Sequence, residues 1–259
     1  MCLLRIAVIL GLITLVAGCA LATDPRDKTE DWPAGKIYST GKKALDSGDY
    51  ETALTYFGTL EARYPFGRHA QQAQLDIAYS HYKQGEADSA ISVIDRFIRS
   101  YPRHTHLDYA YYLRGLANFS RDRQILDRIV RRDPSHRDPG SARQSFNDFE
   151  ILVLRFPNSR YAEDARQRMV YLRNNLAEHE IHVADYYLRR GAYVAAANRA
   201  KYVVENYQRT PAVAEALVTL IEAYTKLELG ELKNNAMRVL RLNYPDHPLV
   251  AKTDTARRR

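Results

Sequence analysis

The residues most able to do chemistry are two pairs of histidines, and neither pair has the partners that a reaction or a metal would need. His104 and His106 flank one threonine, and His179 and His182 fall on one helical face beside acidic neighbours. Zinc takes at least three protein ligands, and the spacing supplies no third ligand here. The chain has no Gly-x-Ser-x-Gly, P-loop or His-Glu-x-x-His pattern. We therefore predict no catalytic residue, no metal, no cofactor and no enzymatic activity.

Cys19 has a different kind of chemistry. Residues 1–18 have a positive start, an apolar run too short to span a bilayer and small residues at the end, which predicts a signal peptide. Val16-Ala17-Gly18-Cys19 resembles the lipobox of bacterial lipoproteins, in which the cysteine is acylated and becomes the first mature residue. The alternative is an ordinary secretory signal. We expect lipidation of Cys19, a lipidated tether at 19–33, and firm anchoring by two or more acyl chains.

The rest of the chain repeats one helical pattern. Ala53, Phe57 and Leu60 lie at i, i+4 and i+7, and Pro65 ends the helix. The same spacing returns from Ala90 to Pro102 and from Ser145 to Pro157, and two fainter copies follow. The step from Ala53 to Ala90 is close to the roughly 34-residue period of tetratricopeptide repeats. A small residue allows close helix approach and a ring fills the wider space, so we predict an all-α tetratricopeptide-repeat solenoid of about five helix pairs, or ten helices.

The expected organisation follows from the repeats and from the segments that break them. The predicted helices are 34–47, 50–64, 69–84, 87–100, 106–120, 141–155, 161–190, a helix of the fourth repeat around 193–203, 212–227 and 231–243. Residues 34–157 form repeats one to three, with an arginine-rich insert at 121–139, and residues 158–245 form repeats four and five. The basic tail at 246–259 is expected to be frayed. The insert is either a solvated, salt-bridged loop or a contact surface.

Aromatic residues recur on the first helix of each early pair. In tetratricopeptide units this helix lines the concave side, where we predict a trough formed by Tyr38, Lys42, Tyr79, Tyr82, Lys83, Tyr109, Tyr112 and Phe119. Rings give apolar contact at a low entropic cost, and ammonium groups attract anions. The trough therefore suits an extended peptide with aromatic side chains and a terminal carboxylate. The alternative is that these tyrosines only pack between helices.

The net charge of +7 favours an acidic partner or anionic headgroups over nucleic acid. An exported chain meets no DNA, and its basic residues are spread along the helices instead of forming one stripe. With Cys2 removed in the signal peptide and Cys19 acylated, the mature chain has no disulfide and no free thiol.

Several short sequence segments, taken together, resemble those of a known protein family. They are Arg-Tyr-Pro-Phe-Gly at 63–67, Ile-Asp-Arg-Phe-Ile-Arg at 94–99, Arg-Asp-Pro at 137–139, Phe-Pro-Asn-Ser at 156–159 and Tyr-Tyr-x-x-Arg-Gly-Ala at 186–192. With the lipobox and the repeats, their order resembles the BamD family, the lipoproteins of the outer-membrane β-barrel assembly machinery. The resemblance covers nearly the whole mature chain.

The resemblance implies a scaffold anchored in the inner leaflet of the outer membrane and facing the periplasm. It implies that the N-terminal repeats receive the C-terminal targeting segment of unfolded outer-membrane β-barrel proteins, which typically ends in an aromatic residue. The C-terminal repeats would bind the POTRA region of BamA, with Asn198 and Arg199 at that contact and Arg199 pairing with a carboxylate. Accessory Bam lipoproteins are further implied partners, although the arginine-rich insert and the basic tail depart from the family pattern.

Two other functions are compatible with a lipid-anchored repeat protein. One is a cell-wall enzyme or its regulator, for which no pair of catalytic acids can be singled out. The other is a general periplasmic adaptor, which would keep the fold without the contact to BamA.

Overall fold

The computed structural model describes residues 29–121 and 139–257, and every regular element in these ranges is an α-helix. The helices are α2 (Ala34–Asp46), α3 (Tyr50–Arg63), α4 (Arg68–Gln84), α5 (Ala87–Ser100), α6 (Leu107–Ser120), α7 (Pro139–Arg155), α8 (Ala162–Arg189), α9 (Tyr193–Asn206), α10 (Ala212–Lys226), α11 (Gly230–Asn243) and α12 (Pro248–Arg257). The prediction of an all-α fold is confirmed. Within the described ranges, no helix has a stretch long and apolar enough to cross a membrane.

Ten of these helices are the predicted ones, and α12 is additional. It begins at Pro248, in a tail that we expected to be frayed, so this detail of the prediction is wrong. Val250 is buried in the same cluster as Leu240 of α11, which explains why the tail is ordered there. Cys19, the signal peptide and most of the insert lie outside the described residues.

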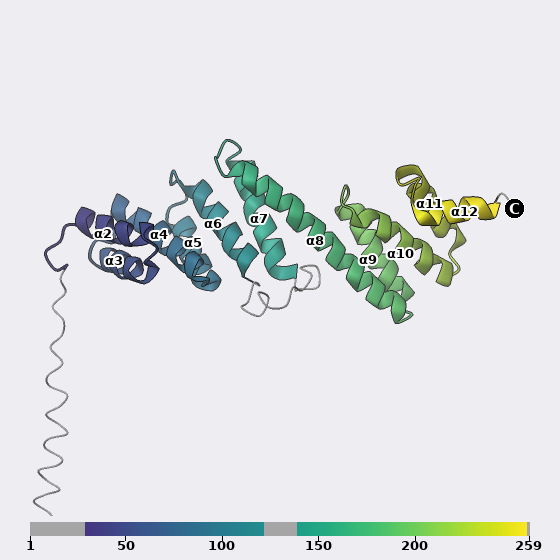
Figure 1. Ribbon diagram of the computed structural model, residues 1–259, viewed down its shortest axis with the longest axis horizontal. Coiled ribbons are helices and arrows are strands. Elements are labelled where there is room, and N and C mark those ends of the chain that lie inside the picture. The colour runs from purple at the N-terminus through teal and green to yellow at the C-terminus, as the bar shows by residue number, and fades with distance from the viewer. Residues whose placement is uncertain (1–28, 122–138, 258–259) are drawn as a thin grey trace, which may run out of the picture. The chain divides into compact units, whose positions relative to one another are not determined.

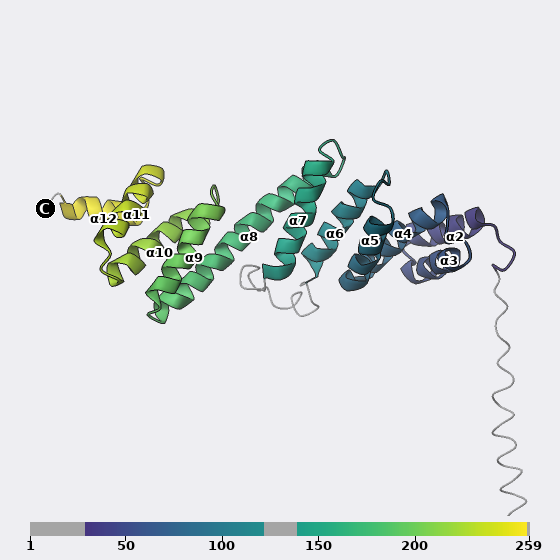
Figure 2. The same cartoon turned by 180° about the vertical axis from the view of Figure 1, so that it is seen from behind.

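The chain divides into two compact units, and the boundary falls inside α4. The described part of the first unit runs from Thr29 to Ala73 and contains α2, α3 and the start of α4. The second unit begins at Gln74 and contains the remaining helices, of which α6, α7 and α8 lie side by side in sequence order (Figures 1 and 2). The division into a substrate half (34–157) and a BamA half (158–245) is a functional prediction that this structural division does not address.

The predicted stripes of small and large residues form the core. Ala53, Phe57 and Leu60 of α3 are completely buried, and so are their counterparts in α5 and α7. Opposite them, glycines on the first helix of the pair allow the closest approach. A Cβ at Gly41 would lie 2.8 Å from the ring of Phe57, and a Cβ at Gly115 would lie 2.5 Å from the ring of Phe149. The pairs α2–α3 and α6–α7 therefore pack ring against glycine.

Glycines also end several first helices. Gly48, Gly85 and Gly191 have φ values of 82°, 84° and 73°, and the residue after each donates its N–H to a carbonyl five residues before it. This is the Schellman ending, which requires a left-handed residue. In the last pair Glu228 takes this position with φ 60°, although Gly230 is only two residues away. The fifth repeat therefore matches the sequence pattern less well but keeps the same left-handed turn.

Replacing Gly115 with alanine should lower the free energy of unfolding by about 1–3 kcal/mol. The added methyl group would overlap Phe149, whose ring is fully buried and cannot move aside. This overlap outweighs the roughly 1 kcal/mol that alanine gains over glycine in a helix. Urea unfolding measures the change. Gly58→Ala is the matched control, since nothing lies within 4 Å of a Cβ at that exposed helical position; a destabilised control with an unaffected Gly115→Ala would contradict the packing argument.

Candidate functional site

The first unit contains Tyr38 and Lys42 of the predicted trough, both on α2. The half-buried ring of Tyr38 lies 5.8 Å from that of Phe57 and 5.3 Å from that of His69, and Lys42 forms an ion pair of 3.4 Å with Asp46. Tyr38 therefore packs against the core of the first pair while part of its ring stays accessible.

The polar segment before α2 is fastened to the first helix pair. The ring of Trp32 stacks on Tyr56 at 6.1 Å, and the ammonium group of Lys36 lies 4.0 Å from the centre of the indole. Tyr64 donates its hydroxyl to the carbonyl of Trp32 at 3.0 Å, and Arg63 donates to the carbonyl of Thr29. Trp32 is therefore docked on the first helix pair.

In the second unit, Tyr79, Tyr82 and Tyr109 pack against one core cluster. The cluster is built from α4, α5 and α6 and includes Leu75 and Phe97. All three tyrosines are half buried, and Lys83 is exposed at the end of α4. Burial raises the pKa of Tyr109 well above its usual value, so its hydroxyl stays protonated over the physiological range. These rings therefore combine packing with an accessible edge.

Tyr112 lies in an aromatic and ionic cluster that the sequence did not reveal. Its ring stacks on Tyr161 at 4.7 Å, and its hydroxyl donates to Asp164 at 2.8 Å. Burial raises its pKa to about 12, and the bond to Asp164 acts in the same direction. Arg168 holds the same carboxylate at 2.6 Å and lies 5.4 Å from the ring of Phe119. Tyr109 also meets Tyr161, at 5.4 Å, so the start of α8 brings Tyr109 and Tyr112 together.

Arg199, the predicted BamA contact, is engaged with the protein's own Glu180. It lies on the exposed side of α9 next to exposed Asn198, and its guanidinium donates to Glu180 at 2.9 Å. Arg143 of α7 donates to the other oxygen of the same carboxylate at 3.0 Å. Glu180 is only 1% exposed, whereas both arginine side chains are about half exposed. One buried acid therefore ties α7, α8 and α9 together.

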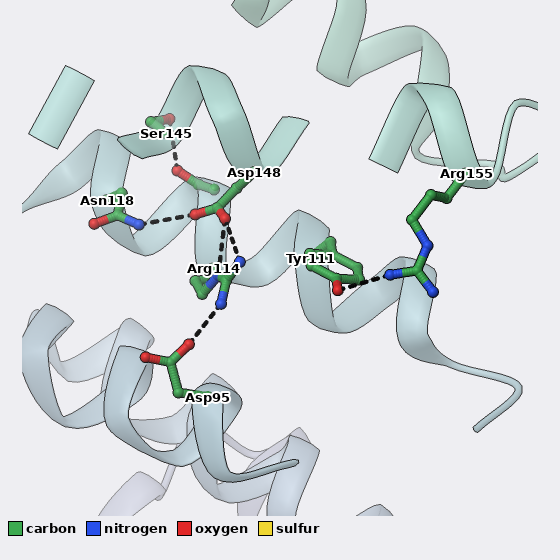
Figure 3. A network of polar contacts seen from close by, with 8 residues as sticks. Asp95, Tyr111, Arg114, Asn118, Ser145, Asp148 and Arg155 are labelled. Atoms are coloured by element: carbon green, nitrogen blue, oxygen red, sulfur yellow. Dashed lines mark hydrogen bonds and ion pairs between the residues drawn. The ribbon is translucent and has the colours of Figure 1, made fainter. Parts of the chain in front are cut away.

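A second buried acid, Asp148, joins α7 to α6, and its partner Arg114 extends the link to α5 (Figure 3). Arg114 of α6 lies 2.6 Å from Asp148 of α7 and 2.6 Å from Asp95 of α5, and Asn118 donates to Asp148 at 2.9 Å. Burial raises the pKa of Asp148, while Arg114 and Asn118 oppose that rise. Nearby, Ser145 donates to the carbonyl of Gly115, and Arg155 donates to the hydroxyl of Tyr111 (Figure 3). The charged groups of this network pair with one another between helices, so the network holds these helices together.

The two residues of the first histidine pair lie close together. The rings of His104 and His106 lie 5.5 Å apart, and burial together with the neighbouring ring lowers the pKa of His104. In the described ranges, no three His, Cys, Asp or Glu side chains come together in a group that could hold a metal ion.

A groove of about 400 Å³ opens between α7, α8 and α9, close to the Glu180 ion pairs. Its lining includes Arg143 and Phe146 from α7, Arg173 from α8, Tyr202 and Asn206 from α9, and Tyr207 directly after α9. Sequence reasoning missed this groove, because its residues come from three helices and none belongs to a motif. The one available signal was the tyrosine pair at 202 and 207, at the end of a helix that otherwise has alanines in its core.

The described residues define an α-helical repeat protein in which buried acids and arginines join successive helices. The family model described as "Outer membrane lipoprotein", YfiO, matches residues 30–240. The outer membrane protein assembly factor BamD of Neisseria meningitidis serogroup B is 46% identical over 222 residues, which cover 86% of this chain and 83% of the relative. The BamD of Vibrio cholerae is 37% identical over 231 residues, covering 89% and 95% of the two chains. The solved structure of a thermophilic TPR protein from Thermus thermophilus aligns with 86% of this chain and 98% of its own, at 15% identity and a TM-score of 0.38.

The chain therefore belongs to the BamD family of outer membrane lipoproteins, and the resemblance seen in the sequence is confirmed.

Proposed function

We propose that the protein is a non-enzymatic lipoprotein scaffold of the outer-membrane β-barrel assembly machinery. The observation that carries this proposal is the match to relatives named outer membrane protein assembly factor over most of both chains. A lipid on Cys19 would hold it in the inner leaflet of the outer membrane, facing the periplasm. The docked segment at Thr29 would then leave only a short tether between the lipid and the first helix pair.

The proposed partners are the POTRA region of BamA, accessory Bam lipoproteins and the C-terminal targeting segment of unfolded β-barrel proteins. The half-buried rings of the second unit support a role in binding the substrate, because tyrosines combine an apolar body with a polar tip. Tyr79, Tyr82, Tyr109 and Tyr112 are the trough residues of that unit that we propose for this contact. Further candidates for the same contact are the other predicted trough residues, Tyr38, Lys42, Lys83 and Phe119.

Asn198 and Arg199 are proposed to lie at the BamA contact. Arg199 is about half exposed while it binds Glu180, so a carboxylate of a partner can reach its remaining N–H groups. Glu180 keeps Arg143 as a partner if Arg199 turns outward. The local structure can therefore release Arg199 without leaving a buried charge unpaired.

Changing Arg199 to alanine should reduce the recovery of BamA with the affinity-tagged lipoprotein about tenfold or more, the usual effect of removing one charged hydrogen-bond partner. The variant should fold, since Arg143 still neutralises Glu180. Quantitative co-purification from membranes measures the loss. Lys201→Ala on the same helix, whose exposed side chain pairs with Glu205, is the matched control and should leave recovery unchanged. Full recovery of BamA with Arg199→Ala would remove this residue from the interface.

A further inference from the structure

The groove between α7, α8 and α9 combines aromatic walls with guanidinium groups. The rings of Tyr202 and Tyr207 meet edge to face at 5.8 Å, and Phe146 comes from the facing helix α7. Tyr202 is 42% exposed even though it is a large ring, whereas the trough aromatics of the second unit are half buried against the core clusters. A volume of about 400 Å³ is sufficient for one aromatic residue with part of its backbone.

Arg173 supplies a donor that the fold uses only weakly. Among the described residues, its guanidinium makes one hydrogen bond, a long one of 3.4 Å to the backbone carbonyl of Asn206. A guanidinium has five N–H donors in a planar fork that matches a carboxylate, so most of its donor capacity faces the groove or solvent. Arg143, which gives an N–H to Glu180, adds a second positive group at the same groove.

The groove also has groups suited to a peptide backbone. The side-chain amides of Asn147 and Asn206 line it and can both donate and accept hydrogen bonds. Glu150 is an exposed acid among the lining residues, and it lowers the net positive charge without cancelling the two arginines. A ligand with one carboxylate, one ring and a short piece of extended backbone therefore fits this set of groups better than a polyanion does.

We propose that this groove binds the C-terminal residue of an unfolded β-barrel protein, with its aromatic ring among Phe146, Tyr202 and Tyr207 and its carboxylate on Arg173. The inference rests on the proposed function, because it takes the substrate class from there and adds a place for its last residue. It locates that residue in the fourth repeat, outside the trough expected from the sequence. A C-terminal residue carries its ring and its carboxylate only a few bonds apart, which a groove of this size can accept together.

The test uses the full mature lipoprotein in detergent and a short fluorescent peptide that ends in phenylalanine, made with either a free carboxylate or an amide. Fluorescence anisotropy gives the dissociation constants. The wild-type protein should bind the acid about tenfold more tightly than the amide, as expected for one charge-assisted pair. Arg173→Gln should abolish this preference by weakening only the acid. Tyr202→Ala should weaken both peptides by a similar factor, because it removes the wall of the groove and leaves the anion site.

Two control variants separate the groove from a general effect of charge or rings. Arg166→Gln removes another arginine of α8, one that also gives a long bond to a backbone carbonyl, and Tyr186→Ala removes an exposed tyrosine that lies outside the groove, on α8. Both should bind the two peptides as the wild type does. The proposal is overturned if Arg173→Gln keeps the preference for the acid, or if Tyr79→Ala weakens binding while the groove variants do not.

The same variants distinguish the groove from the wider function. If the groove variants bind both peptides normally but fail to recover BamA, the groove belongs to the BamA contact and the proposal is overturned. If the wild-type protein binds neither peptide, the substrate role in the proposed function fails together with the groove. If the wild type binds the peptides and the groove substitutions leave both affinities unchanged, the substrate role stands and the proposed location is wrong.

Discussion

Replacing Arg114 with methionine should lower the free energy of unfolding by about 3–5 kcal/mol, because it leaves a buried carboxylate without its cation. Asp148 is only 6% exposed, and after the change its one remaining side-chain partner among the described residues is the amide of Asn118. Methionine keeps most of the apolar volume of the side chain, so the loss reports on the charge. Urea unfolding at neutral pH measures it. Arg121→Met, which breaks the exposed pair with Asp88, should change stability by less than about 1 kcal/mol.

The loss at Arg114 should shrink as the pH falls. Burial raises the pKa of Asp148 in the folded protein, so folding favours its protonated form. A group with a raised folded pKa stabilises the fold below its unfolded pKa and loses that contribution as the pH rises through the folded value. Removing Arg114 takes away the main group that opposes the rise, so the pKa of Asp148 should move further up. The variant should therefore recover part of its deficit at mildly acidic pH, whereas a deficit that is constant with pH would show that packing, and not the charge, is responsible.

The helices and their buried stripes were predictable from sequence because each one is a local pattern. Ala53, Phe57 and Leu60 repeat at helical spacing with a proline behind them, and this spacing alone places them on one face. The order of the tail was not predictable, because α12 depends on Val250 reaching a cluster formed by residues of other helices.

The ion pairs depend on contacts between helices, so only partial signals for them are visible in the sequence. Arg114 is the only basic residue in α6, a helix that is otherwise largely apolar, and a single cation in such a helix indicates a buried partner. Glu180 gave no such signal, because it is one of many charged residues in α8. The groove beside it combines residues from three helices, and only the packing of those helices brings Phe146 near Tyr202.

Changing Arg143 and Arg199 together should destabilise the protein far more than the sum of the two single changes. Each single alanine variant leaves Glu180 with one cation, and each arginine is about half exposed, so we expect a loss of about 1 kcal/mol or less from either. The double variant leaves a carboxylate that is 1% exposed without a cation, which should cost about 3 kcal/mol or more. A double-mutant cycle by urea unfolding gives the coupling energy directly.

A third substitution separates the charge of Glu180 from the packing around it. Glu180→Gln in the double-variant background removes the unpaired charge at nearly constant volume and should restore most of the lost stability. Additive single losses, or no recovery with glutamine, would show that the two arginines do not share the acid as their distances of 3.0 and 2.9 Å indicate. A shared acid would permit Arg199 to leave for a partner's carboxylate while Glu180 keeps Arg143, so that α7 and α8 stay joined by this pair. We therefore expect the Arg199 variant to stay folded and yet to recover less BamA. The two results are compatible because Arg143 still pairs with Glu180 in that variant.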